Sequence, residues 1–148
     1  MAGRIFAIDP GTHESGFCLY DEGKVISSGV MDNHDLLRVV ADDRSDVLAI
    51  EKVVSYGRAV GQEVFDTCEW AGRFRQVWGC PDETLSVTRL QVKQALGLKG
   101  SADDAKVNAR LREVIGEKGT KANPGPTFGV TSHAWAALGV AYAAAKMT

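Results

Sequence analysis

The chain has 148 residues, of which 45% are hydrophobic, and this size and composition predict a single domain, residues 1–148, with its own core. No apolar stretch is long enough to span a bilayer and no signal peptide is recognisable, so we expect a cytoplasmic protein without a membrane partner. Three cysteines without C-x-x-C spacing predict reduced thiols instead of disulfides or a zinc site; they are Cys18, Cys68 and Cys80.

The net charge of −2 conceals an uneven distribution of charge along the chain. Residues 1–55 hold 10 Asp and Glu against 5 Lys and Arg, whereas residues 86–121 hold 8 Lys and Arg against 4 Asp and Glu. An acidic region beside a basic one suits a metal-dependent enzyme that acts on a polyanion. A solvated surface of mixed charge would give the same counts, so charge alone leaves both interpretations open.

The first part of the chain predicts three strands, at residues 4–9, 15–20 and 24–31. The apolar residues from Ile5 to Ile8 are consecutive, which is typical of a strand buried on both faces. Pro10-Gly11 ends this strand and leaves Asp9 at its carboxyl end.

A second apolar run, at residues 46–51, also ends in a carboxylate, that of Glu51. Because the carboxyl ends of parallel strands meet at one edge of a sheet, Asp9 and Glu51 are expected to lie together. Two carboxylates at such an edge predict a divalent-metal site. The alternatives are that Asp9 only caps the following turn and that Glu51 forms an ordinary surface pair with Lys52.

The remaining segments predict helices and one further strand. Apolar residues at helical spacing indicate an amphipathic helix from Gly61 to Val77, and they are Val64, Phe65, Cys68, Ala71, Phe74 and Val77. The other expected elements are a short helix from Asn33 or Asp35 to Val40, a strand at 85–87, a helix at 90–96, a helix opened by Ser101–Asp104 and ending near Ile115, a loop at 118–128 and a last helix capped by Ser132. This order predicts an α/β fold whose mixed five-stranded sheet has one antiparallel edge and is flanked by helices.

Four segments in this order carry a resemblance to a known family. They are Ala7–Thr12 with Gly16 in the strand after it, Ala49–Glu51, Val92–Gly97 followed by Ala105–Val107, and Ser132–Leu138. They are similar to the two acidic motifs, the basic segment and the final helix of the ribonuclease-H-like nucleases. Within that superfamily the chain resembles the RuvC-type Holliday junction resolvases, especially the small phage members, over nearly its whole length.

The resemblance implies an activity and a site. It implies a crossover junction endodeoxyribonuclease, homodimeric, that cuts four-way junctions and other branched DNA in a bacterial or phage-infected cell with two Mg²⁺ or Mn²⁺ ions per active site. Asp9 would bridge the two ions, and Glu51 and His133 would each bind one of them. Lys106 would neutralise charge on the scissile phosphate. For His133, a structural role at the start of a helix is an equal alternative.

One position departs from the family pattern. The family's final helix carries an acid or a histidine followed by an aspartate three residues later, and here His133 is followed by Ala136. Residues three apart on a helix share a face, so an acid at position 136 would point with His133 toward Asp9 and Glu51. With alanine there, one ligand is missing and the chain is expected to be strongly impaired, whether the change is natural or engineered.

Several residues outside this group are candidates for binding DNA, namely Tyr56, Arg73, Arg75, Lys93, Lys99, Lys106 and Arg110. Tyr56 would stack on an unpaired base, with packing as the alternative, and the lysines have solvated helix faces as theirs. The stripe of Trp70, Phe74 and Trp78 indicates core or dimer interface. A homodimer matched to the junction's twofold symmetry would use the helix at 61–78.

Three other functions compete with this interpretation. A YqgF-type RNA-processing nuclease usually has a basic Lys-Arg pair after its first aspartate, whereas this chain has His13-Glu14-Ser15. The actin and sugar-kinase fold needs two such domains, for which 148 residues are too few. A catalytically inactive scaffold that binds branched DNA stays possible because of Ala136.

Overall fold

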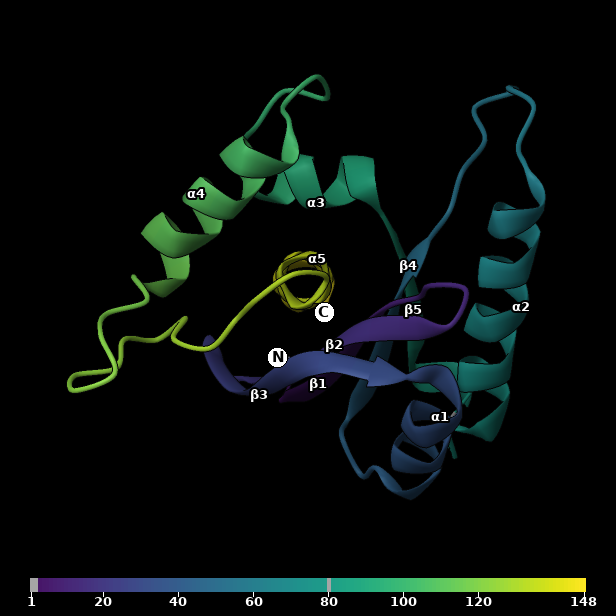
Figure 1. Cartoon of the computed structure of the whole chain (residues 1–148), viewed down its shortest axis with the longest axis horizontal. Helices are drawn as coiled ribbons and strands as arrows, with labels where there is room; N and C mark the ends of the chain where they lie inside the picture. Colours follow the sequence, from purple (N-terminus) through teal and green to yellow (C-terminus); the bar gives the residue numbers. More distant parts are fainter. Residues whose placement is uncertain (1–2, 80) are drawn as a thin grey trace.

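The computed structural model describes residues 3–79 and 81–148; Cys80, one of the three predicted free thiols, lies outside these ranges. Its sheet has the order β3-β2-β1-β4-β5 (Figure 1). The strands are β1 (Arg4–Asp9), β2 (Glu14–Asp21), β3 (Lys24–Asp32), β4 (Val47–Lys52) and β5 (Thr84–Thr88). β1, β4 and β5 are parallel, whereas β2 is antiparallel to both β1 and β3. The predicted mixed α/β sheet with an antiparallel edge is confirmed.

Helices cover both faces of this sheet. They are α1 (Asn33–Asp42), α2 (Gln62–Val77), the short 3₁₀ helix η1 (Pro81–Glu83), α3 (Arg89–Ala95), α4 (Asp104–Ile115) and α5 (Ala134–Met147). α1 and α2 pack on one face, and α5 packs on the other, between the sheet and the pair α3 and α4 (Figure 1). Within the described part of the chain, no helix combines the length and apolarity needed to cross a membrane.

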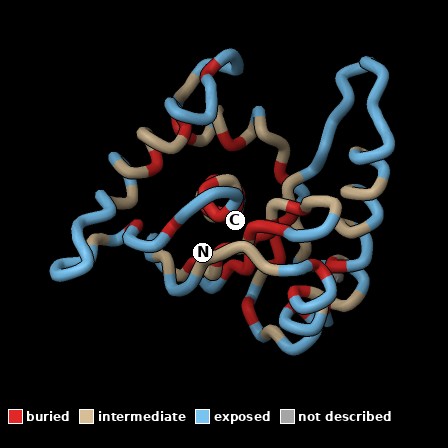
Figure 2. Tube along the Cα trace, in the orientation of Figure 1, coloured by how far each residue is buried: buried red, intermediate tan, exposed pale blue. Residues whose placement is uncertain are grey.

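The central strands are buried on both faces because their side chains alternate between two cores. Phe6 and Ile8 pack toward α1 and α2, whereas Ile5 and Ala7 pack toward α5. α5 is the most completely buried helix (Figure 2). Its many alanines let it lie close to the sheet, and this closeness is what places its first turn beside the ends of β1 and β4.

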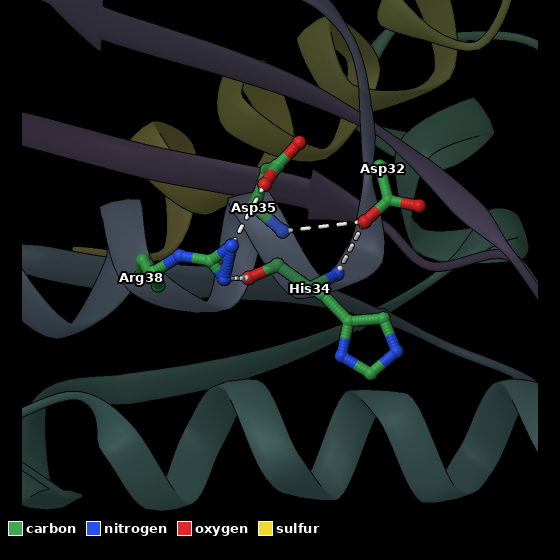
Figure 3. Close-up of polar contacts among 4 residues, drawn as sticks. All are labelled: Asp32, His34, Asp35 and Arg38. Atoms are coloured by element: carbon green, nitrogen blue, oxygen red, sulfur yellow. Dashed lines mark hydrogen bonds and ion pairs between the residues drawn. The ribbon is translucent and has the colours of Figure 1, made fainter.

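The start of α1 corrects one prediction. The side chain that caps this helix is Asp32, whose Oδ1 accepts hydrogen bonds from the amides of His34 at 2.9 Å and Asp35 at 3.3 Å (Figure 3). Neither expected cap, Asn33 or Asp35, has this role: Asp35 lies inside the helix, and Asn33 is fully buried. Its Nδ2 donates to the carbonyl of Gly11 at 2.9 Å, so its amide holds the turn after β1 in place.

Two further helix starts also differ by one or two residues. α4 is capped by Asp103, whose Oδ1 accepts from the amide of Lys106 at 2.9 Å, and Ser101 lies outside the helix. The cap position of α5 belongs to His133, which makes no side-chain capping bond. Ser132, the expected cap, has a positive φ of 50°, a conformation outside the range of an N-cap residue.

The amphipathic pattern of α2 is only half realised. Phe74 is fully buried, Trp78 is 3% exposed, and Trp70 packs beside them, so the aromatic stripe belongs to the core. Phe65, however, is 55% exposed and Cys68 is exposed too, although both belong to the predicted apolar face. The reason is that the first turns of α2 extend past the sheet, where the described residues offer them no surface to pack against (Figure 1).

Candidate active site

Asp9 and Glu51 lie side by side at the carboxyl ends of two adjacent parallel strands. Ile8 of β1 is in register with Ile50 of β4, so the acids that follow these residues are also neighbours. Both acids continue the alternate series that faces α5, in which Ala7 precedes Asp9. Because neighbouring residues of a strand point to opposite faces, Glu51 points away from Lys52 and toward Asp9.

The two carboxyl groups share a proton. Burial, the adjacent charge of Asp9 and a hydrogen bond to Asp9 together raise the pKa of Glu51 to about 8, against the opposing charge of Arg89. Burial also raises the pKa of Asp9, whereas the hydrogen bond from Glu51 and the charge of Arg89 lower it. At neutral pH the Glu51 carboxyl therefore keeps its proton and donates it to the Asp9 carboxylate.

His133 completes this group from α5. Its Nδ1 lies 3.3 Å from Oδ2 of Asp9, and its side chain is 64% exposed whereas that of Asp9 is only 12% exposed. Gly16 of β2, the residue paired with Asp9, makes this approach possible, since a Cβ there would lie 2.2 Å from the carbonyl oxygen of His133. Sequence and structure thus bring Asp9, Glu51 and His133 together.

The turn after Asp9 is held by other residues. Ser15 Oγ accepts from the amide of Gly11 at 3.1 Å and donates to Asn33 Oδ1 at 2.5 Å. These partners make a capping role for Asp9 unnecessary. Its carboxylate is free to face the site.

Ala136 lies one helical turn beyond His133 and brings no donor to the site. Over residues 3–79 and 81–148, no group of three or more His, Cys, Asp and Glu side chains is arranged to hold a metal ion. At the site itself, however, Oε1 of Glu51 is buried and has no hydrogen-bond partner among the described residues.

Two charged residues near the acids were missed by the sequence reasoning, and they are Arg89 and Asp104. The charge of Arg89 lowers the pKa of both Asp9 and Glu51, and that of Asp104 raises both. Arg89 Nη2 donates to Oδ1 of Asp104 at 2.6 Å. The available signal was position: Arg89 directly follows β5, the third parallel strand that ends at this edge.

The predicted DNA-binding residues fall into two groups. Four already have partners within the chain. Lys93 Nζ donates to the carbonyl of Gly100, and Arg110 donates to the carbonyl of Leu96 and to the carboxylate of Glu113. Arg75 donates to Ser86 Oγ, and the guanidinium of Arg73 lies over the Trp70 ring. Three are exposed: Lys99, Lys106 and Tyr56. Tyr56 is 67% exposed with a φ of 51°, so the packing role considered for it does not occur within this chain.

Two hollows flank the acids. One, of about 600 Å³, opens between the turn after β1 and the first turns of α2 and is lined in part by His13, Glu63 and His133. The other, of about 240 Å³, is lined in part by Glu51 and Arg75. The larger hollow thus reaches His133, and the smaller one reaches Glu51.

The side chains suit one hard divalent cation. Asp9 and Glu51 offer carboxylate oxygens, one of them buried without a partner, and His133 offers a ring nitrogen on the exposed side. By donor type these residues would hold Mg²⁺ or Mn²⁺, although among the described residues they are not arranged as a preformed metal site. A second ion, which the sequence led us to expect, would lack the carboxylate that position 136 does not supply.

Comparison with known proteins supports the fold. No family model and no curated protein matches the chain. Among solved structures, the chain is similar to Thermus thermophilus RuvC, with a TM-score of 0.71 and 20% sequence identity over 97% of this chain and 96% of that one. It is equally similar to T. thermophilus RuvC in complex with a Holliday junction substrate, with a TM-score of 0.71 and 19% identity over 98% of this chain and 96% of that one. The chain has the RuvC-type fold that its motifs predict.

Proposed function

We propose that this chain binds branched DNA, above all four-way junctions, and that its site is that of a metal-dependent endonuclease. The observation that carries the proposal is the meeting of Asp9, Glu51 and His133 at one edge of a RuvC-type sheet. The solved RuvC that holds a Holliday junction substrate has the same fold over nearly the full chain, which supports the choice of substrate.

The roles of the residues follow from their positions. Asp9, central and shielded, would hold the cation, and Glu51 would join it after losing its proton. His133 would bind from the open side, where the DNA backbone can enter. A bound divalent cation supplies a Lewis acid and an activated water to phosphodiester hydrolysis. Lys106 and Lys99, exposed in the basic region, would contact phosphates near the junction.

The residues also explain why the chain as it stands is a weak catalyst in this proposal. Hydrolysis needs charge neutralisation on the attacking side and on the leaving side of the phosphorus. Asp9, Glu51 and His133 would hold one ion for this purpose, and Ala136 supplies no ligand for a second. Binding of DNA depends on other residues, so it is expected to persist when cleavage is slow.

The experiment is a junction-cleavage assay in Mn²⁺ or Mg²⁺ that compares the native chain with its Ala136→Asp form. The Asp9→Asn form is the matched control, since it removes the central carboxylate at nearly constant volume. Native protein is expected to bind a four-way junction in preference to linear duplex of equal length and sequence. Equal affinity for the two DNAs would contradict the proposal.

One observation favours a second candidate, a branched-DNA-binding scaffold without catalysis, and that observation is the alanine at position 136. The same assay separates the two functions. Selective junction binding without cleavage by the native, the Ala136→Asp or the Arg89→Gln/Ala136→Asp form would establish the scaffold. A structured RNA included in parallel tests the RNA-processing alternative, because cleavage confined to RNA would assign the chain to that branch.

A further inference from the structure

Arg89 occupies an unusual position beside the acids. It is the first residue of α3, and its side chain is only 27% exposed. One end of its guanidinium is fixed, since Nη2 donates to Oδ1 of Asp104 at 2.6 Å. The other end, Nη1, is buried and has no hydrogen-bond partner among the described residues. A buried guanidinium nitrogen without a partner is costly unless a negative charge lies nearby.

The sequence of α5 makes room for this side chain. Gly139 lies on the same side of α5 as Ala136, one turn further along. A Cβ at position 139 would lie 2.9 Å from Cγ1 of Val92 and 3.8 Å from Nη1 of Arg89. The glycine therefore lets α3 pack tightly on α5 and brings the guanidinium next to the face on which the missing carboxylate would lie.

The charges at the site balance around this residue. Arg89 stabilises the ionised forms of Asp9 and Glu51, and Asp104 holds it in that position from the other side. Its unpartnered Nη1 and the unpartnered Oε1 of Glu51 are both buried. The chain thus provides a fixed positive charge near two acids that have only one metal position to share.

We propose that Arg89 takes the place of the second metal ion, so that this site binds a single divalent cation with the guanidinium as its permanent neighbour. The inference rests on the proposed function in taking Asp9 and Glu51 as metal ligands. Arg89 acts through these carboxylates and is a positioning residue. The alanine at position 136 and Arg89 then belong together, because an acid at position 136 would pair with the guanidinium instead of binding a metal ion.

The test counts metal ions. Mn²⁺ binding to the purified chain without DNA is followed by electron paramagnetic resonance of the free ion and by calorimetry. The native chain is expected to bind one Mn²⁺. The Ala136→Asp form is also expected to bind one, since the new carboxylate pairs with Arg89. The Arg89→Gln/Ala136→Asp form is expected to bind two, whereas the charge-preserving Arg89→Lys/Ala136→Asp form binds one.

Affinity for the first ion gives a second measurement, one that a merely structural role of Arg89 would not produce. At a pH at which both acids are ionised in every variant, Arg89→Gln removes a positive charge beside the ligands and is expected to tighten Mn²⁺ binding about tenfold, while Arg89→Lys leaves it nearly unchanged. Adding Asp104→Asn to the Arg89→Gln/Ala136→Asp form is expected to keep the count at two, which excludes Asp104 as the new ligand.

Several results would overturn the inference. These are two ions in the native chain, two ions in the Ala136→Asp form, one ion in a well-folded Arg89→Gln/Ala136→Asp form, or weaker binding after Arg89→Gln. Circular dichroism and the unfolding midpoint establish that each variant is folded. The proposed function fails separately: if no variant selects a four-way junction over linear duplex, the metal count still decides the role of Arg89.

Discussion

At the scale of single residues, Glu51 shows the conflict between stability and function most clearly. Its carboxyl is buried beside another acid, and its pKa is raised to about 8, well above the ordinary value for a glutamate. The folded protein therefore binds a proton here that the unfolded chain releases at lower pH. As the pH rises from about 4.5 to about 8, the unfolded chain loses this proton while the folded chain keeps it. The free energy of unfolding therefore falls over this interval.

We predict that Glu51→Gln stabilises the metal-free protein and that the gain increases with pH across this interval. Glutamine keeps a hydrogen-bond donor toward Asp9 without the charge, so the free energy of unfolding should rise by about 2–4 kcal/mol near pH 8 and by little near pH 4.5. Urea unfolding at several pH values without metal measures the effect. A gain that is the same at every pH would show that Glu51 has an ordinary pKa.

Metal affinity should rise with pH, whereas the stability of the metal-free native protein falls. The cation needs both carboxylates ionised, so Mn²⁺ affinity is expected to increase as the pH rises toward 8 and to level off above it. Calorimetry across this range in a buffer that does not bind Mn²⁺ measures the trend. Asp9→Asn, which removes the neighbouring charge and a ligand, should abolish most of the binding at every pH.

How far the sequence predicts the site also depends on single residues. Asp9 and Glu51 could be predicted because each ends a conspicuous apolar run, and the ends of parallel strands meet by geometry. Arg89 could not be separated from other basic residues, because its importance lies in the pairing with Asp104 and the space above Gly139. Such contacts depend on how two helices pack, and no local pattern records that.

At the scale of helices and strands, the start of α4 shows how the structure chooses between two nearby residues that could both cap the helix. Ser101 and Asp103 both have side chains that cap helices well, and the sequence pattern favoured the first. The structure gives the role to Asp103, which accepts from the amide of Lys106 at 2.9 Å. Sequence patterns place helix ends within a residue or two, since adjacent capping residues compete and the loop geometry decides between them.

We predict that Asp103→Ala lowers the free energy of unfolding by about 1 kcal/mol, because it leaves the amide of Lys106 without its acceptor. Ser101→Ala, two residues earlier and exposed, is the matched control and is expected to change it by less than about 0.5 kcal/mol. Urea unfolding monitored by tryptophan fluorescence compares the two. A larger loss for Ser101→Ala would return the capping role to the serine.

The close contact between β2 and α5 depends on the glycine at position 16. A Cβ there would lie 2.2 Å from the carbonyl oxygen of His133, and a backbone atom cannot yield as a flexible side chain can. Gly16→Ala is therefore expected to push the first turn of α5 away and to cost about 2 kcal/mol or more. His133 moves with it, so Mn²⁺ affinity should fall as well. Gly72→Ala, at a helical position of α2 where nothing lies within 4 Å of an added Cβ, controls for the general effect of alanine.

At the scale of the whole molecule, exposed apolar side chains are concentrated in one region of the chain. Five of the eleven large hydrophobic residues that are exposed in the described ranges fall between positions 53 and 65, in the loop after β4 and the start of α2. They are Val53, Val54, Tyr56, Val60 and Phe65. Helical periodicity marked Phe65 as inward-facing, whereas the structure leaves it 55% exposed. A four-way junction has twofold symmetry, and a second copy of the chain docked on this region would match it.

We predict that the native chain is a dimer at micromolar concentration and that Phe65→Glu converts it to a monomer, because a charge on an apolar interface is left without a partner. Val114→Glu is the matched control: Val114 is 45% exposed on α4, away from the loop after β4 and the start of α2, and its substitution should leave the dimer intact. Size-exclusion chromatography with light scattering measures the mass of each form.

The Phe65→Glu monomer should also bind a four-way junction more weakly and with a shallower dependence of affinity on salt, since half of the phosphate contacts are lost. A native monomer would contradict the predicted dimer. A dimer that survives Phe65→Glu but not Val114→Glu would place the dimer contact on another surface.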